Sequence, residues 1–152
     1  MLDINRKTEA VMYLRGDKNN PLGYIYFKYD NINNTDVICI GWSKVNRVFD
    51  KFDKSRGQTI AIKRGYKTTD WAHTQKSFDM TSHIGSIHHS NIPFTLKDNI
   101  EMYFDKAKRH FSISSDVVFI ISATETNFVF GGDELPTDGK IETKTIYTKI
   151  LY

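Results

Sequence analysis

The sequence contains a single cysteine, Cys39, among its 152 residues. One cysteine excludes an intramolecular disulfide and any zinc or iron–sulfur site that needs several cysteines. Cys39 stands in the apolar run 36–43, which is typical of a buried strand. We therefore expect a small core side chain. A catalytic thiol needs a neighbouring base and partial exposure, and the surrounding residues indicate neither.

Long apolar runs are also lacking. No segment approaches the roughly 20 apolar residues that cross a bilayer, and residues 1–7 lack the apolar core of a signal peptide. Together with the lack of disulfide capacity, this predicts a cytoplasmic protein (in the host cell cytoplasm if it is viral) with no membrane partner. A chain of 152 residues is long enough to fold as one domain, 1–152, without a metal.

Nucleotide-binding motifs are missing as well. The sequence has no Gly-x-x-x-x-Gly-Lys-Ser/Thr loop, and the glycine pair at 131–132 is followed by Asp133 and Glu134, which would repel phosphate. These absences predict that the protein needs no cofactor.

Aromatic residues are plentiful, with ten Phe, eight Tyr and two Trp, and large rings can build a core from few residues. Apolar and aromatic segments are separated by turn formers near both ends of the chain, which favours antiparallel pairing of neighbouring strands. The segments that predict strands are residues 9–15, 24–29 and 37–42 in the first third, and 116–124, 126–130 and 141–151 in the last third.

A long amphipathic helix is predicted over about 95–111, because apolar residues recur there at helical spacing. Thr95 can act as its N-cap, with Asp98 in a capping-box-like position. A shorter helix is predicted over about 53–64, with Asp53 as N-cap and Gly65 as the stop. Polar and apolar residues alternate near the end of this segment, so a strand is the alternative. The predicted fold class is α+β, an antiparallel sheet of N- and C-terminal strands packed on these helices.

Positive charge is concentrated in residues 44–67, which hold eight basic and two acidic residues in a chain of net charge +3. Such a cluster is typical of a surface that faces anions. If the segment is helical, Arg56, Lys63 and Lys67 share one face. Tyr66, Trp71 and Trp42 lie close by in the sequence and could stack on bases, as in single-strand or RNA binding. The alternative is a solvated helix face beside core aromatics. The candidate binding residues are Lys44, Arg47, Lys51, Lys54, Arg56, Lys63, Arg64, Lys67, Tyr66 and Trp71.

Histidines are concentrated in the polar segment 66–94, which has little periodicity. Imidazoles together with Asp70 or Asp79 would suit zinc or manganese, and an ordered loop of this length is often functional. The spacing matches no named metal motif, so an exposed polar loop is the alternative. The candidate ligands are His73, His83, His88 and His89.

The sequence contains Gly41-Trp-Ser, then Phe52-Asp-Lys-Ser-Arg-Gly57, then Ile60-Ala61 and Arg64. This pattern resembles one in small bacteriophage-encoded accessory proteins of uncharacterised function. The likeness covers residues 38–65, with a looser likeness over 92–111. The resemblance implies a viral accessory protein and no particular activity.

Three functional hypotheses follow. The first is a non-enzymatic phage-type accessory protein whose basic segment binds nucleic acid or a nucleic-acid-handling host complex. The second is an inhibitor that docks directly on a host protein, in host takeover or against host defence. The third is a small metal-dependent hydrolase that uses the loop 70–90.

Overall fold

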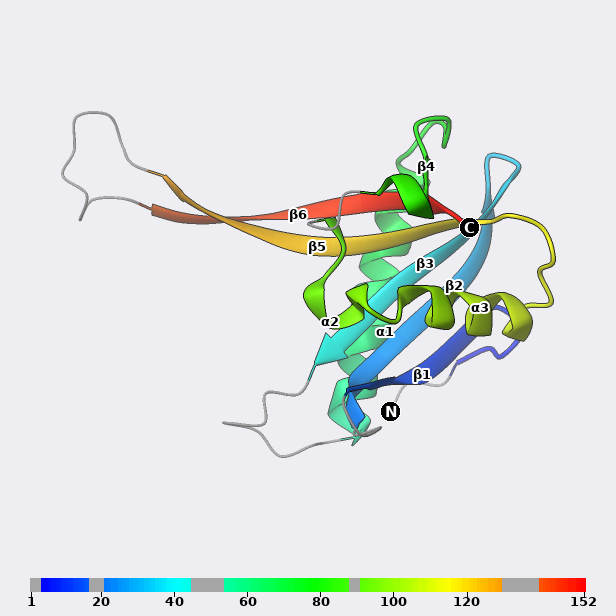
Figure 1. Ribbon diagram of the computed structural model, residues 1–152, viewed down its shortest axis with the longest axis horizontal. Helices are drawn as coiled ribbons and strands as arrows, with labels where there is room; N and C mark the ends of the chain where they lie inside the picture. The colour runs from blue at the N-terminus through cyan, green and yellow to red at the C-terminus, as the bar shows by residue number, and fades with distance from the viewer. Residues whose placement is uncertain (1–3, 17–20, 45–53, 88–90, 130–139) are drawn as a thin grey trace.

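The computed structural model describes residues 4–16, 21–44, 54–87, 91–129 and 140–152. In these parts of the chain, six strands form one sheet in the order β1-β2-β3-β5-β6-β4 (Figure 1). Helices cover both faces of the sheet, and most strand pairs are antiparallel. The predicted α+β class is confirmed.

The N-terminal strands form the predicted antiparallel meander of β1 (Glu9–Arg15), β2 (Pro21–Ile32) and β3 (Thr35–Lys44). The tight turn between β2 and β3 places Asn33 and Asn34 at positive φ, a conformation that asparagine tolerates better than most residues. Short connections therefore set the register of this half of the sheet.

The C-terminal strands form a second antiparallel pair, β5 (Val118–Val129) with β6 (Lys140–Leu151). The two-residue strand β4 (Ser82–His83) lies along the outer side of β6. Figure 1 shows that β5 and β6 continue as a two-stranded ribbon beyond the other strands. The two halves of the sheet meet where β3 and β5 run parallel, and they pair only between Val37–Cys39 and Val118–Ile120.

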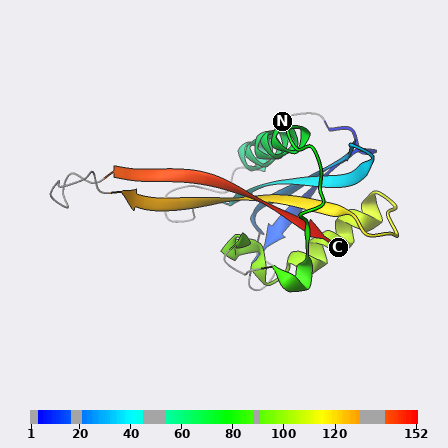
Figure 2. The same ribbon diagram turned by 90° about the horizontal axis from the view of Figure 1, so that it is seen from above.

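The helices lie in two layers, with the sheet between them (Figure 2). Helix α1 (Lys54–His73) lies on one face, and α2 (Phe94–Lys97) and α3 (Ile100–His110) lie on the other. None of the helices in the described residues is long and apolar enough to cross a membrane.

The largest apolar core lies between the sheet and α3. Phe104 stacks on Phe119 of β5 with ring centroids 3.9 Å apart, and Phe27 of β2 meets the same ring edge-on. The apolar positions whose spacing predicted the helix are buried here: Leu96, Ile100, Tyr103, Phe104 and Ala107.

The predicted helix 95–111 is not continuous. It is divided into α2 and α3, because Asn99 has φ −123° and ψ 15° and so leaves the helical conformation. Asp and Asn favour such breaks, since their side chains compete for backbone hydrogen bonds. Thr95 is not the N-cap, because that position belongs to Pro93.

The predicted helix 53–64 was too short, and Gly65 is not its stop. Helix α1 continues to His73, so residues 66–73 of the supposed loop are helical. Gly65 lies inside the helix, at a position where the backbone of α1 approaches the sheet too closely for a side chain. A Cβ on Gly65 would lie 2.1 Å from Cδ1 of Tyr26, and one on Gly41 of β3 would lie 2.1 Å from the Gly65 nitrogen. Both glycines are needed for the close approach of helix and strand. Asp53 lies outside the described residues.

We expect the substitution Gly65→Ala to destabilise the protein although alanine is the better helix former. Helix propensity alone would favour alanine by about 1 kcal/mol, but the added methyl collides with the buried Tyr26 ring. Overpacking of this kind costs about 1–3 kcal/mol. Thermal unfolding followed by circular dichroism should show a lower melting temperature for this variant.

The matched control is Gly85→Ala, because a Cβ there would meet nothing within 4 Å. This variant should melt close to the parent protein. A Gly65→Ala variant that is as stable as the control would contradict the direct contact between α1 and the sheet.

Candidate nucleic-acid interface

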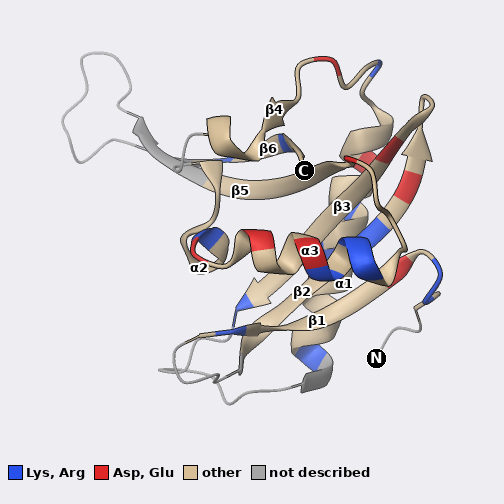
Figure 3. Cartoon of the chain, turned by 45° about the vertical axis from the view of Figure 1, so that its right-hand side comes forward, with Lys and Arg blue, Asp and Glu red and all other residues tan. Residues whose placement is uncertain are grey.

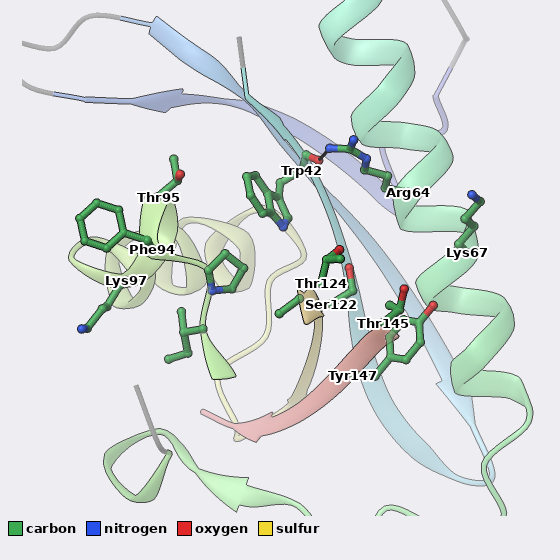
Figure 4. A pocket seen from close by; sticks show the side chains of 13 residues that line it. Trp42, Arg64, Lys67, Phe94, Thr95, Lys97, Ser122, Thr124, Thr145 and Tyr147 are labelled. Atoms are coloured by element: carbon green, nitrogen blue, oxygen red, sulfur yellow. Dashed lines mark hydrogen bonds between the residues drawn. The ribbon is translucent and has the colours of Figure 1, made fainter. Parts of the chain in front are cut away.

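A cleft opens where β3 and β5 separate. Their pairing ends at Cys39 and Ile120, and beyond these residues β3 continues under α1 while β5 continues into the ribbon. Because the strands are parallel, the cleft lies at their carboxyl ends, the usual place for ligands where a parallel pair separates. The cleft has a volume of about 970 Å³. Its lining is drawn in Figure 4 and consists of Trp42, Arg64, Lys67, Ile92, Pro93, Phe94, Thr95, Lys97, Ser122, Ala123, Thr124, Thr145 and Tyr147.

Helix α1 is tied to β3 by two side chains just past the point of separation. Arg64 Nη1 donates to the Trp42 carbonyl oxygen at 2.9 Å (Figure 4), and Thr68 Oγ1 donates to the Ile40 carbonyl oxygen at 3.0 Å. The first bond uses one of the five N–H donors of the guanidinium group. Arg64 is therefore held at the cleft with donors left to meet an anion.

The charge of the cleft is of one sign. Arg64 and Lys67 of α1 stand on one side, and Lys97 of α2 stands on the other (Figure 4). The described residues that line the cleft include no Asp or Glu, and none of the three cations forms an ion pair with any described residue. Uncompensated cations around a concave surface attract anions.

Helix α3 shows the contrast. Its outward side carries acids and bases together (Figure 3). Lys108 Nζ donates to the Tyr152 carbonyl oxygen at 3.0 Å, and the Tyr152 hydroxyl donates to Asp105 Oδ1 at 2.5 Å. This hydrogen bond to Asp105 raises the pKa of Tyr152 to about 12. The charges of α3 therefore offer no comparable surface of one sign.

Hydroxyl groups line the β5–β6 side of the cleft. Ser122 pairs with Tyr147 and Thr124 with Thr145, and alternate residues of a strand point to the same face. Tyr147 is held by Trp71 of α1, whose ring stacks on it at 4.5 Å between centroids and 14° between planes. This wall can donate and accept hydrogen bonds.

Two further aromatic rings, besides Tyr147, contribute to the lining. Trp42 is partly buried against the α3 side of the core. Phe94 begins α2 and is 85% exposed, although it borders the cleft. A cation-lined cleft with accessible rings can hold phosphates and bases together.

The structure brings part of the predicted basic set together. Arg64 and Lys67 line the cleft, and Lys44, Arg56 and Lys63 are exposed at the end of β3 and on α1. The remaining predicted cations are not described by the structure: Arg47 and Lys51 lie outside the described residues, as does the side chain of Lys54.

The two predicted rings have different surroundings. Tyr66 lies on the other flank of α1, edge-on to Tyr26 at 6.0 Å and with the Lys28 Nζ 5.3 Å from its ring centroid. It does not line the cleft. Trp71 is occupied by its stack on Tyr147. Trp42, the third ring near the basic segment, is partly buried against the core and also lines the cleft.

The candidate metal ligands do not form a cluster in the described residues. The His73 imidazole lies at the end of α1, with Nε2 2.7 Å from Asp30 Oδ2 of β2. His83 is exposed in β4. His88 and His89 lie outside the described residues.

Sequence reasoning missed Lys97, Phe94 and the hydroxyl wall. Lys97 lies in the segment predicted as the long amphipathic helix and was not among the predicted binding residues, and nothing marked Phe94 as exposed. One signal existed for the wall, because the alternation in residues 141–151 already placed Thr143, Thr145 and Tyr147 on one face of a strand. Their position beside α1 follows only from the separation of β3 and β5.

Comparison with known proteins gives no match: no family model fits the chain, and no curated protein or solved structure matches it.

Cys39 has the predicted core position, with no exposed surface, and burial raises the pKa of its thiol to about 12. We expect it to be unreactive in the folded protein, since the thiolate is the nucleophile. A thiol-reactive dye at about pH 8, near the ordinary thiol pKa, should label the protein only after denaturant is added. Rapid labelling of the native protein would contradict the buried position.

Proposed function

We propose that this protein is a non-enzymatic binding protein that engages nucleic acid through the cleft between β3 and β5. The observation that carries the proposal is the set of three cations, Arg64, Lys67 and Lys97, which two helices on opposite faces of the sheet bring to one cleft. Phosphate groups are the partners that such uncompensated cations favour, because binding releases the counterions of the nucleic acid.

The lining of the cleft supports binding rather than catalysis. Its described residues include no Asp, Glu or His, the residues that most often act as general acids and bases. The hydroxyl wall supplies hydrogen-bonding groups that can contact phosphate, sugar or base edges.

Further cations can extend the contact beyond the cleft. Arg56 and Lys63 are exposed on α1, and Lys44 is exposed at the end of β3. A strand of nucleic acid that leaves the cleft along α1 would meet these groups. The setting that we propose is that of the bacteriophage-encoded accessory proteins that residues 38–65 resemble.

The proposal predicts that Lys67→Glu combined with Lys97→Glu weakens binding of a fluorescent oligonucleotide by about tenfold or more. The slope of log affinity against log salt should also become shallower, by about 1.4 if two phosphate contacts to a single strand are lost. Fluorescence anisotropy over a series of salt concentrations measures both quantities.

The matched control is Lys76→Glu combined with Lys106→Glu, which changes the net charge equally at two exposed positions that do not line the cleft. We expect this variant to bind much more tightly than the cleft variant. An equal loss in both variants, or no binding by the parent protein, would contradict the proposal.

A further inference from the structure

We infer that the nucleic acid bound in the cleft is single-stranded and that one of its bases stacks on Phe94. This inference rests on the proposed function and specifies its ligand. It is drawn from the exposure of one ring, the shape of the cleft and the placement of the cations around it.

Phe94 is exposed in a way that its neighbours are not. It opens α2 with 85% of its surface accessible, whereas Leu96 in the same helix is fully buried. An isolated exposed apolar side chain needs no explanation, and Met80, 86% exposed and away from the cleft, is an example. Phe94 differs because it borders a cleft that holds three cations and two other aromatic rings, Trp42 and Tyr147.

The shape of the cleft favours a single strand over a duplex. Proteins that read duplex DNA insert a convex element, a helix or a ribbon, into a groove. The lining here is concave, and its volume of about 970 Å³ is at the upper end of small-ligand pockets. Such a space accepts a few unstacked nucleotides, and unstacked bases are what aromatic side chains bind.

The cations are placed to hold phosphates on both sides of a stacked base. Lys97 follows Phe94 by three residues, so the two side chains are neighbours on α2. Arg64 and Lys67 line the cleft from α1, on the side opposite to α2 (Figure 4). A strand that crosses from α2 to α1 would place one phosphate at each side and its base at the ring.

The substitutions Phe94→Ala, Phe94→Leu and Phe94→Trp test the inference, with Met80→Ala as the control for loss of an exposed apolar side chain. The probes are fluorescent oligothymidylate, oligouridylate, and a hairpin duplex with the same number of phosphates. Stacking measured by alanine substitution accounts for about 1–3 kcal/mol per base. We therefore expect the affinity of the alanine variant for a single strand to fall by at least about fivefold.

The leucine variant should lose affinity as the alanine variant does, because it keeps apolar bulk without an aromatic face. The tryptophan variant and Met80→Ala should bind as the parent does, and duplex affinity should be weaker than single-strand affinity and insensitive to residue 94. Preference between the two single strands shows whether the ligand is DNA or RNA, and either supports the inference.

Two results would overturn the inference alone: equal or tighter binding of the duplex, or full single-strand affinity of Phe94→Ala. In either case the charge dependence of the cleft still supports the proposed function. If the parent binds neither single strand nor duplex, both proposals fail.

Discussion

The direct contact of α1 with β3 is the constraint on which the other features depend. Gly41 and Gly65 remove the side chains that would otherwise separate helix and strand, so the helix backbone lies against the sheet. Thr68 and Arg64 then reach carbonyl oxygens of β3. Since β5 has separated from β3 at this point, the sheet has a gap beside α1. The helix therefore supports one wall of a cleft as well as covering a core.

The position of the cleft explains how its three cations come together. Arg64 and Lys67 come from the layer on one face of the sheet, and Lys97 comes from the other. Side chains from helices on opposite faces of the sheet meet here because the sheet between them is interrupted. The hydroxyl groups of β5 and β6 provide the remaining side without negative charge. An anion can thus approach cations from two layers at once.

The fold class, the meander and the core face of α3 followed from local patterns. Apolar and aromatic segments between turn residues indicated β1 to β3, and the spacing of Leu96, Ile100 and Phe104 indicated the buried side of the helix. The helix ends were wrong for physical reasons. Glycine commonly ends helices, but at position 65 it is required by the packing of α1 against the sheet. The break at Asn99 depends on backbone angles that periodicity does not report.

The sequence by itself determined the composition of this protein's surface and core: one buried thiol, an aromatic core, and a basic segment at residues 44–67. Only the tertiary structure decided which cations face one another. Lys97 lies 30 residues from Lys67, and the two line one cleft because β3 and β5 pair over three residues and then separate. Charge density is a local property of the chain, whereas the meeting of charges from two layers depends on where the sheet is interrupted.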